Sequence, residues 1–259
     1  MREVDDLSLL VGAAHEAGDI ARRYFRRDPK VWDKPGSAGP VSEADLEVDA
    51  MLHDRLIGAR PDYGWLSEET PDSQARLGTD RLFIVDPIDG TRAFIEGDPS
   101  WSHSLAVVRG GEVSAAVVYI PVSGKLYAAA RGQGATLNDA PVAVSGQTEL
   151  TGAAVLGTRA NFEPWHWAEA DVPEVRRKFR SSLAYRMSLV AEGRYDAMLS
   201  LRATWEWDVA AGALIVTEAG GRVSDRRGAA LRFNNAMPQV NGVVAAGPVL
   251  HEELGRRLV

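Results

Sequence analysis

The sequence predicts a mixed α/β protein of the α+β type. Three observations lead to this fold class. The chain begins and ends with helical patterns, its middle holds closely spaced apolar, β-prone runs, and its second half alternates strand and helix patterns. With 259 residues, of which 45% are hydrophobic, the chain can bury one large core or two modest ones.

The first sixty residues are predicted to form two helices. Apolar residues recur every three or four positions over residues 4–27, which is the pattern of an amphipathic helix. A stretch rich in Pro and Gly follows. Ser42 and, three residues later, Asp45 fit the start of a second helix, which we expect to end near Pro61.

The middle of the chain is predicted to form an antiparallel sheet. Residues 82–85 are a short apolar run that ends abruptly at Asp86-Pro87. Short turns separate three further apolar runs, which we expect to pair as a meander, at 103–109, 112–120 and 124–131.

The remainder is predicted to alternate strands and helices. The expected elements are a strand at 151–157, helices at 182–193 and at 207–219 before Gly220-Gly221, a strand at 240–246 and a helix at 248–258. A boundary near 145–150 would divide the chain into an N-terminal unit, residues 1–148, and a C-terminal unit, residues 149–259.

Composition excludes several classes of function. A net charge of −7 argues against a protein that binds nucleic acid by neutralising phosphates. The absence of cysteine excludes disulfides, thiolate metal sites and a cysteine nucleophile, and the five scattered histidines argue against zinc. No apolar run approaches the ~18–20 residues of a membrane helix. We therefore expect a soluble, cytoplasmic protein with neither nucleic-acid nor membrane partners.

The sharpest local feature is an apolar strand that delivers two carboxylates three positions apart, in the segment Val85-Asp86-Pro87-Ile88-Asp89-Gly90-Thr91. A turn there can bring Asp86, Asp89 and the carbonyl of Ile88 to one point, and hard ions such as Mg²⁺ prefer such oxygen clusters. The N–H groups of Gly90 and Thr91 could hold a phosphate. Taken alone, the segment also fits an ordinary turn with two solvated aspartates.

Other acidic residues stand in weaker contexts. Glu68-Glu69 closes a short apolar segment, Asp208 opens a helix of small residues, and Asp45 stands at the start of the second helix. Each has an ordinary alternative, because adjacent glutamates usually form a solvated surface and an aspartate at a helix start usually caps it. Their order and spacing carry more information than any one of them.

Four stretches combine into a stronger signal: Lys34 with residues 40–45, Glu68-Glu69 before Asp86–Thr91, residues 190–196, and Trp207–Gly212 before Gly220-Gly221. In order and spacing they resemble the inositol monophosphatase family of Mg²⁺-dependent, lithium-sensitive phosphomonoesterases, over essentially the whole chain. The resemblance implies a layered αβαβα sandwich of the inositol monophosphatase and fructose-1,6-bisphosphatase type. It places the metal site between the two units.

The resemblance also implies two or three Mg²⁺ ions. The implied ligand sets are Glu68, Asp86 and the Ile88 carbonyl for one ion, Asp86, Asp89 and Asp208 for a second, and Glu68 with Asp45 for a third, weaker ion. Clustered carboxylates repel one another, and cations relieve this repulsion while they neutralise a phosphate. Metal ions would also lower the pKa of a water and stabilise the leaving oxygen.

Catalytic roles follow from the same resemblance. Thr91, hydrogen-bonded to a carboxylate, would position the attacking water, Glu68 would help to accept its proton, and Asp45 belongs to the same catalytic group. The expected phosphate and substrate contacts are Gly90, Thr91, Ser182, Ala184 and Arg186. The arginines that could grip a second phosphate are Arg159, Arg180, Arg186 and Arg202.

The substrate is indicated less sharply. Inositol-type members carry an acidic residue a few positions before the aspartate of the second signature, but residues 199–205 hold none. Ser182-Leu183 and the run Arg92–Ile95 look more like bacterial 3′(2′),5′-bisphosphate nucleotidases, the preferred interpretation. Inositol-1-monophosphatase and histidinol-phosphatase remain alternatives, and a non-catalytic binding or regulatory protein of this fold is the alternative of another class. Family precedent implies a homodimer.

Overall fold

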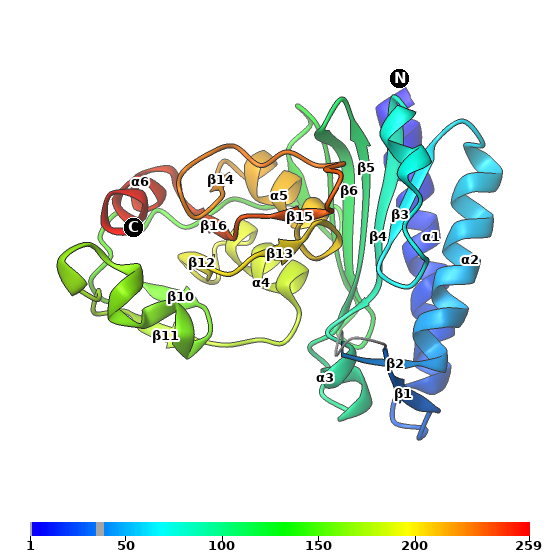
Figure 1. Ribbon diagram of the computed structural model, residues 1–259, viewed down its shortest axis with the longest axis horizontal. Helices are drawn as coiled ribbons and strands as arrows, with labels where there is room; N and C mark the ends of the chain where they lie inside the picture. The colour runs from blue at the N-terminus through cyan, green and yellow to red at the C-terminus, as the bar shows by residue number, and fades with distance from the viewer. Residues whose placement is uncertain (1, 35–38) are drawn as a thin grey trace.

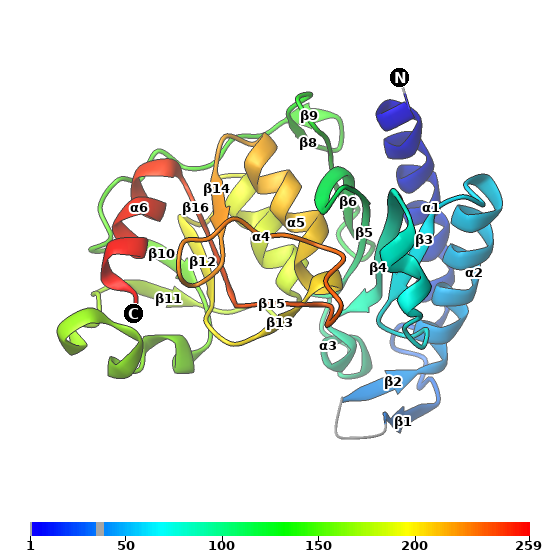
Figure 2. The same ribbon diagram turned by 45° about the horizontal axis from the view of Figure 1, so that its top comes forward.

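The computed structural model describes residues 2–34 and 39–259, which form five layers (Figure 1, Figure 2). Helices α1 and α2 cover one face of a seven-stranded sheet. Helices α4 and α5 fill the space between that sheet and a five-stranded sheet, and α6 covers the outer face of the second sheet. This order of layers confirms the αβαβα sandwich that the sequence implies.

The outer helical layer consists of α1 (Arg2–Tyr24) and α2 (Glu43–Ala59), close to the predicted ranges. Small residues of α1 such as Ala17 are fully buried, which lets this helix approach the sheet closely. At the start of α2 the backbone N–H of Ser42 donates to Oδ2 of Asp45 over 2.9 Å. Asp45 is thus the N3 residue of a capping box whose N-cap is Ser42, as the spacing of the two residues predicts.

The large sheet has the order β3-β4-β5-β6-β7-β8-β9. Its strands are β3 (Gly64–Ser67), β4 (Arg81–Asp89), β5 (Ser102–Arg109), β6 (Glu112–Ile120), β7 (Lys125–Ala130), β8 (Ala135–Leu137) and β9 (Ala140–Pro141). The antiparallel meander of β5, β6 and β7 is confirmed. The predicted end of the preceding strand at Asp86-Pro87 is wrong, because β4 continues to Asp89 through a bulge.

The middle layer consists of α4 (Leu183–Ala191) and α5 (Glu206–Glu218), which agree with the predicted helices. Helix α5 is buried on almost every side from Val209 to Val216, as expected of a helix packed between two sheets. Gly220, with a φ of 84°, follows its end. Side chains of both sheets meet these helices in one core, which crosses the predicted boundary at 148–149. The division into two units stays a prediction.

The small sheet has the order β11-β10-β12-β16-β14, and α6 (Pro248–Arg257) packs on it. Its strands are β10 (Ala154–Leu156), β11 (Arg176–Lys178), β12 (Ala197–Ser200), β14 (Arg222–Ser224) and β16 (Val243–Ala246). The single strand predicted at 240–246 is wrong. Gly242, with a φ of 75°, separates β16 from β15 (Gln239–Val240), which pairs with β13 (Thr204–Trp205).

Short elements complete the described chain. They are the ribbon of β1 (Val31–Asp33) and β2 (Pro40–Ser42), the helix α3 (Thr91–Ile95), and 3₁₀ turns at Gln74–Gly78, Arg159–Phe162, Pro164–His166 and Ala168–Ala170. Within residues 2–34 and 39–259, no helix combines the length and apolar character needed to cross a membrane.

Candidate active site

A bulge in β4 aims two carboxylates at the same side of the large sheet. Asp86 and Asp89 pair with residues of β5 that are only two apart, so Pro87 and Ile88 face the single residue His103. In a regular strand, residues three apart point to opposite faces. The extra residue in the bulge shifts Asp89 to the same face as Asp86, so both aspartates line one cleft. Ile88 turns to the other face, into the core beneath α1 and α2.

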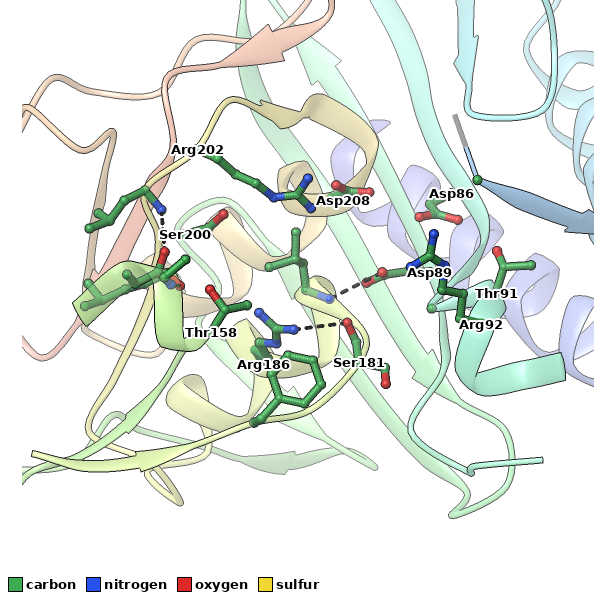
Figure 3. A pocket seen from close by; sticks show the side chains of 18 of the residues that line it. Asp86, Asp89, Thr91, Arg92, Thr158, Ser181, Arg186, Ser200, Arg202 and Asp208 are labelled. Carbon is green, nitrogen blue, oxygen red and sulfur yellow. Dashed lines mark hydrogen bonds between the residues drawn. The ribbon is translucent and has the colours of Figure 1, made fainter. Parts of the chain in front are cut away.

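Asp208, in the first turn of α5, completes an acidic cluster with Asp86 and Asp89. Each residue offers one carboxylate oxygen, and these oxygens all lie within 4.8 Å of one another. Figure 3 shows the three side chains in the cleft, with Asp208 lying between Asp86 and Arg202 in this view. Oδ1 of Asp86 is buried and has no hydrogen-bond partner in the described part of the chain. A cation bound here would satisfy this oxygen.

Burial raises the pKa of all three carboxyl groups. The charge of Glu68 adds to the rise for Asp86, and the charge of Asp89 adds to it for Asp208. The pKa of Asp89 is raised only to about 6, because hydrogen bonds to its carboxylate oppose the effect of burial. Carboxylates this close together repel one another, and a bound cation would stabilise their ionised forms.

Glu68 and Glu69 lie just after β3 and share a lysine. Nζ of Lys34 is 2.7 Å from Oε1 of Glu68 and 2.7 Å from Oε1 of Glu69. Burial raises the pKa of Glu69 to about 7, and the charge of Glu68 adds to this rise. Glu68 lines the cleft. The structure therefore brings it to the site, where it is paired with Lys34 beside the cluster of aspartates.

Thr91 lies where the bulge ends and α3 begins. It follows Gly90, whose φ of 96° is accessible to glycine but costly for other residues. The Thr91 hydroxyl is 3.1 Å from Oδ1 of Asp45 and 3.1 Å from the carbonyl oxygen of Ile88. Burial raises the pKa of Asp45 to about 6. The expected hydrogen bond between Thr91 and a carboxylate is present, and Asp45 supplies the carboxylate.

The start of α4 holds Asp89 in place. The Ser182 hydroxyl donates to Oδ2 of Asp89 over 2.6 Å, and the backbone N–H of Ala184 donates to the same oxygen over 2.7 Å. Both residues are fully buried. The sequence leads us to expect Ser182 and Ala184 in contact with substrate. In the structure the Ser182 hydroxyl and the Ala184 N–H donate to the Asp89 carboxylate, and their contact with substrate stays a prediction. A helix N-terminus stabilises such a charge.

Beside the acidic cluster the cleft is lined by two arginines, which we call the basic wall. The cleft has a volume of about 600 Å³, and both Arg186 of α4 and Arg202 after β12 line it (Figure 3). The Arg186 side chain is almost buried, and its guanidinium lies over the ring of Phe179 at 4.5 Å. Burial lowers the pKa of Arg186 to about 10. The other two arginines named from the sequence, Arg159 and Arg180, do not belong to the cleft lining.

Several residues that line the cleft are not predicted by the sequence. They come from loops of the second half of the chain: Thr158, Ala160, Asn161, His166, Phe179 and Ser181. No periodicity or motif predicts them, because irregular loops carry them to the cleft. Glu206, the carboxylate nearest in sequence to Asp208, is buried and accepts hydrogen bonds from the backbone of Asn234 and Asn235. It therefore stabilises a loop, and the basic wall has no carboxylate of its own in the described lining.

Comparison with known proteins identifies the family. The model of the inositol monophosphatase family matches residues 3–259. The chain is 36% identical over 238 residues to an inositol-1-monophosphatase of Rhizobium meliloti, with 86% of each chain covered. It is 32% identical to a histidinol-phosphatase of Chlorobaculum parvum, covering 98% of this chain and 95% of the relative. The solved structure of the Thermotoga maritima IMPase superposes with a TM-score of 0.83 at 29% identity, covering 97% and 96% of the two chains.

The chain belongs to the inositol monophosphatase family. Members of this family are phosphatases, so the protein is a phosphoric monoester hydrolase. The family depends on metal ions, typically Mg²⁺, and the acidic cluster could bind them. The resemblance noted from the sequence is thereby confirmed.

Proposed function

We propose that this phosphatase uses Mg²⁺ held by Asp86, Asp89 and Asp208 to hydrolyse a phosphate monoester that carries a second phosphate group, as in a 3′(2′),5′-bisphosphate nucleotide. One observation carries the proposal: a largely buried cluster of three carboxylates shares a single cleft with Arg186 and Arg202. A substrate with two phosphates can meet both walls at once.

The acidic cluster fits Mg²⁺ in its donor chemistry. All the atoms it offers are carboxylate oxygens, which hard divalent ions prefer, and one of them is buried without a partner. We propose two or three ions, with Glu68, the Ile88 carbonyl and Asp45 as the further ligands. When bound, Mg²⁺ supplies Lewis-acid chemistry that makes a water more acidic and offsets charge on the phosphoryl group and the leaving oxygen.

The residues around the cluster would orient the reactants. The Thr91 hydroxyl, fixed by Asp45 and by the Ile88 carbonyl, would direct the attacking water. Glu68 lies beside the cluster and would receive the proton of that water. The backbone N–H groups of Gly90 and Thr91 would bind oxygens of the phosphate that is cleaved.

The basic wall favours a second anionic group on the substrate. Arginine binds phosphate by two parallel hydrogen bonds, and Arg186 is already held in place by a hydrogen bond of 2.5 Å from its Nε to the Arg180 carbonyl oxygen. Among the described lining residues, the basic wall offers no carboxylate that would select a polyol such as inositol. The ammonium group of histidinol phosphate would be repelled by Arg186 and Arg202.

The substrate class is tested by phosphate release in Mg²⁺ and in EDTA. The panel contains 3′-phosphoadenosine 5′-phosphate, adenosine 3′-monophosphate, inositol 1-phosphate, histidinol phosphate and fructose 1,6-bisphosphate. We expect the first compound to exceed the others at least tenfold in kcat/KM, which corresponds to about 1.4 kcal/mol of differential transition-state stabilisation. Adenosine 3′-monophosphate is the matched control that lacks the second phosphate. A preference for inositol 1-phosphate or histidinol phosphate would refute the assignment.

The metal requirement is tested separately by thermal unfolding. A ligand that binds only the native state raises its stability in proportion to the logarithm of ligand concentration. We expect millimolar Mg²⁺ to raise the Tm and EDTA to reverse the shift. A Tm that is independent of Mg²⁺ would contradict the metal site.

We further propose that the enzyme is a cytoplasmic homodimer, as the family resemblance implies. Sedimentation equilibrium at micromolar concentration tests the oligomeric state, and a mass equal to the 28.0 kDa chain would rule out a stable dimer.

A further inference from the structure

His103 is the single residue of β5 that faces the bulge, and it is completely buried. Its Nδ1 lies 2.5 Å from the carbonyl oxygen of Pro87. Its Nε2 has no hydrogen-bond partner within the described residues. The ring packs against Trp101 and Tyr119, with centroids 5.5 Å and 6.3 Å away, in the core beneath α1 and α2. A buried imidazole with an unsatisfied nitrogen costs stability, so its presence here calls for an explanation.

The donor and the acceptor in the hydrogen bond between His103 and Pro87 can be assigned. Burial lowers the pKa of His103 to about 4, so the imidazole is neutral near neutral pH and carries one N–H. A carbonyl oxygen can only accept a hydrogen bond. The proton is therefore on Nδ1, and His103 donates to Pro87.

The Pro87 carbonyl is the group through which the surrounding residues can hold the backbone of the bulge. Proline has no backbone N–H, so residue 87 can be tied to its surroundings by polar contact only through its carbonyl oxygen. A bulge also interrupts the ladder of backbone hydrogen bonds between strands. The next carbonyl, that of Ile88, accepts a hydrogen bond from Thr91. Two side chains thus hold the two carbonyls of the bulge, one in the core and one at the cleft.

We propose that His103 is a positioning residue of the metal site, whose hydrogen bond to Pro87 holds the bulge that turns Asp86 and Asp89 to the same face. Without the bulge, residues three apart in β4 would diverge, and the acidic cluster would lose one member. His103 acts through the backbone and touches neither metal nor substrate. The inference rests on the Mg²⁺ site proposed above.

The test compares side chains that separate hydrogen bonding from packing. His103→Asn keeps an N–H donor at the same number of bonds from the backbone but leaves a void beside Trp101. His103→Leu fills more of the space and has no donor. We measure Mg²⁺ affinity by calorimetry and the Tm in EDTA. We expect His103→Leu to bind Mg²⁺ at least tenfold more weakly, in the range that residues supporting metal ligands usually show, and His103→Asn to stay within threefold of the wild type.

The Tm in EDTA measures the effect of each substitution on packing, separately from its effect on Mg²⁺ affinity. The void should lower the Tm of His103→Asn in EDTA, so affinity and stability would respond to different features of the side chain. Tyr119→Phe, which changes the same aromatic layer away from Pro87, is the matched control and should leave Mg²⁺ affinity unchanged. If His103→Leu does not fold, His103→Met, which also lacks an N–H donor, takes its place.

The outcomes separate this inference from the proposed function. A wild-type protein that binds no Mg²⁺ would refute the metal site and the role of His103 together. Normal Mg²⁺ binding by the wild type and equally tight binding by His103→Leu or its Met substitute would refute the role of His103 alone. Equal weakening in the Asn and Leu variants would also refute it, because the effect would then follow packing and not the hydrogen bond.

Discussion

The two walls of the cleft are constructed differently. The acidic wall consists of the buried Asp86 and Asp89 on a sheet strand and the half-buried Asp208 on the first turn of a helix. Asp89 receives hydrogen bonds from Ser182 and Ala184. The basic wall consists of Arg186, which is almost buried, and Arg202, which is exposed on a loop. The carboxylates of the acidic wall are held by a strand and a helix, while one of the two arginines of the basic wall is an exposed side chain on a loop.

This difference suggests that the acidic wall serves catalysis and the basic wall serves substrate recognition. Metal ions require ligands at closely defined distances, so the acidic wall needs rigid support from sheet and helix. Recognition of a substrate group by a long side chain tolerates movement, and loop residues change more readily than a strand inside a core. We therefore expect changes to the acidic wall to abolish catalysis and changes to the basic wall to alter substrate preference.

The largest effect is expected from Asp208→Asn. This substitution removes one charge from the acidic cluster, and we expect kcat to fall by roughly a thousandfold or more because a metal ligand is lost. In EDTA the Tm should rise slightly, since the same change relieves buried repulsion. Steady-state kinetics and thermal unfolding measure the two effects. An Asn variant with nearly normal kcat would remove Asp208 from the metal site.

Thr91→Val should have the next largest effect. Valine has almost the shape of threonine but cannot donate to Asp45 or to the Ile88 carbonyl, so the water would lose its orienting group. We expect kcat at saturating Mg²⁺ to fall by about a hundredfold, with KM little changed. Thr91→Ser, which keeps the hydroxyl, is the control. If Thr91→Val and Thr91→Ser behave alike, the hydroxyl has no part in the reaction.

Arg202→Gln tests the basic wall. We expect kcat/KM for 3′-phosphoadenosine 5′-phosphate to fall by about tenfold, because a charge-assisted hydrogen bond to the second phosphate is lost. The value for adenosine 3′-monophosphate should stay nearly constant. Arg159→Gln, outside the cleft lining, is the matched control. An equal loss for both nucleotides would show that Arg202 does not distinguish the second phosphate.

The smallest effect concerns pH. Burial raises the pKa of Asp45 and Asp89 to about 6 in the folded protein, against about 3.9 for an unperturbed aspartate. The folded state therefore binds more protons between these values, and the stability these groups contribute is lost as pH rises through about 6. Mg²⁺ binding needs ionised carboxylates, so its stabilisation grows over the same range.

The measurable consequence is a Tm difference between Mg²⁺ and EDTA samples that widens by a few degrees from about pH 5 to about pH 7.5. Asp45→Asn should reduce the widening. A difference that is constant across this range would mean that the acidic groups do not control metal binding.

Local patterns in the chain were enough to predict the fold class, most helix and strand positions, and the identity of the acidic residues. Periodicity and caps decide helices such as α2, because these signals are local and Ser42 and Asp45 lie one turn apart. The order of the signature residues likewise points to the family without any coordinates. Strand β4 shows the limit of these local signals, because they predict a turn after Asp86 whereas the strand continues to Asp89.

The bulge, the partners of the site residues and the composition of the basic wall could not be predicted from local patterns and became visible in the folded chain. The bulge depends on pairing with β5, and Asp89 meets Ser182 and Ala184 across 93 to 95 positions of sequence. Arg186 and Arg202 become neighbours of Asp208 because α4 and α5 are packed between two sheets. These features follow from long-range packing, which has no local signature in the chain, whereas helix caps and apolar periodicity act within a few residues.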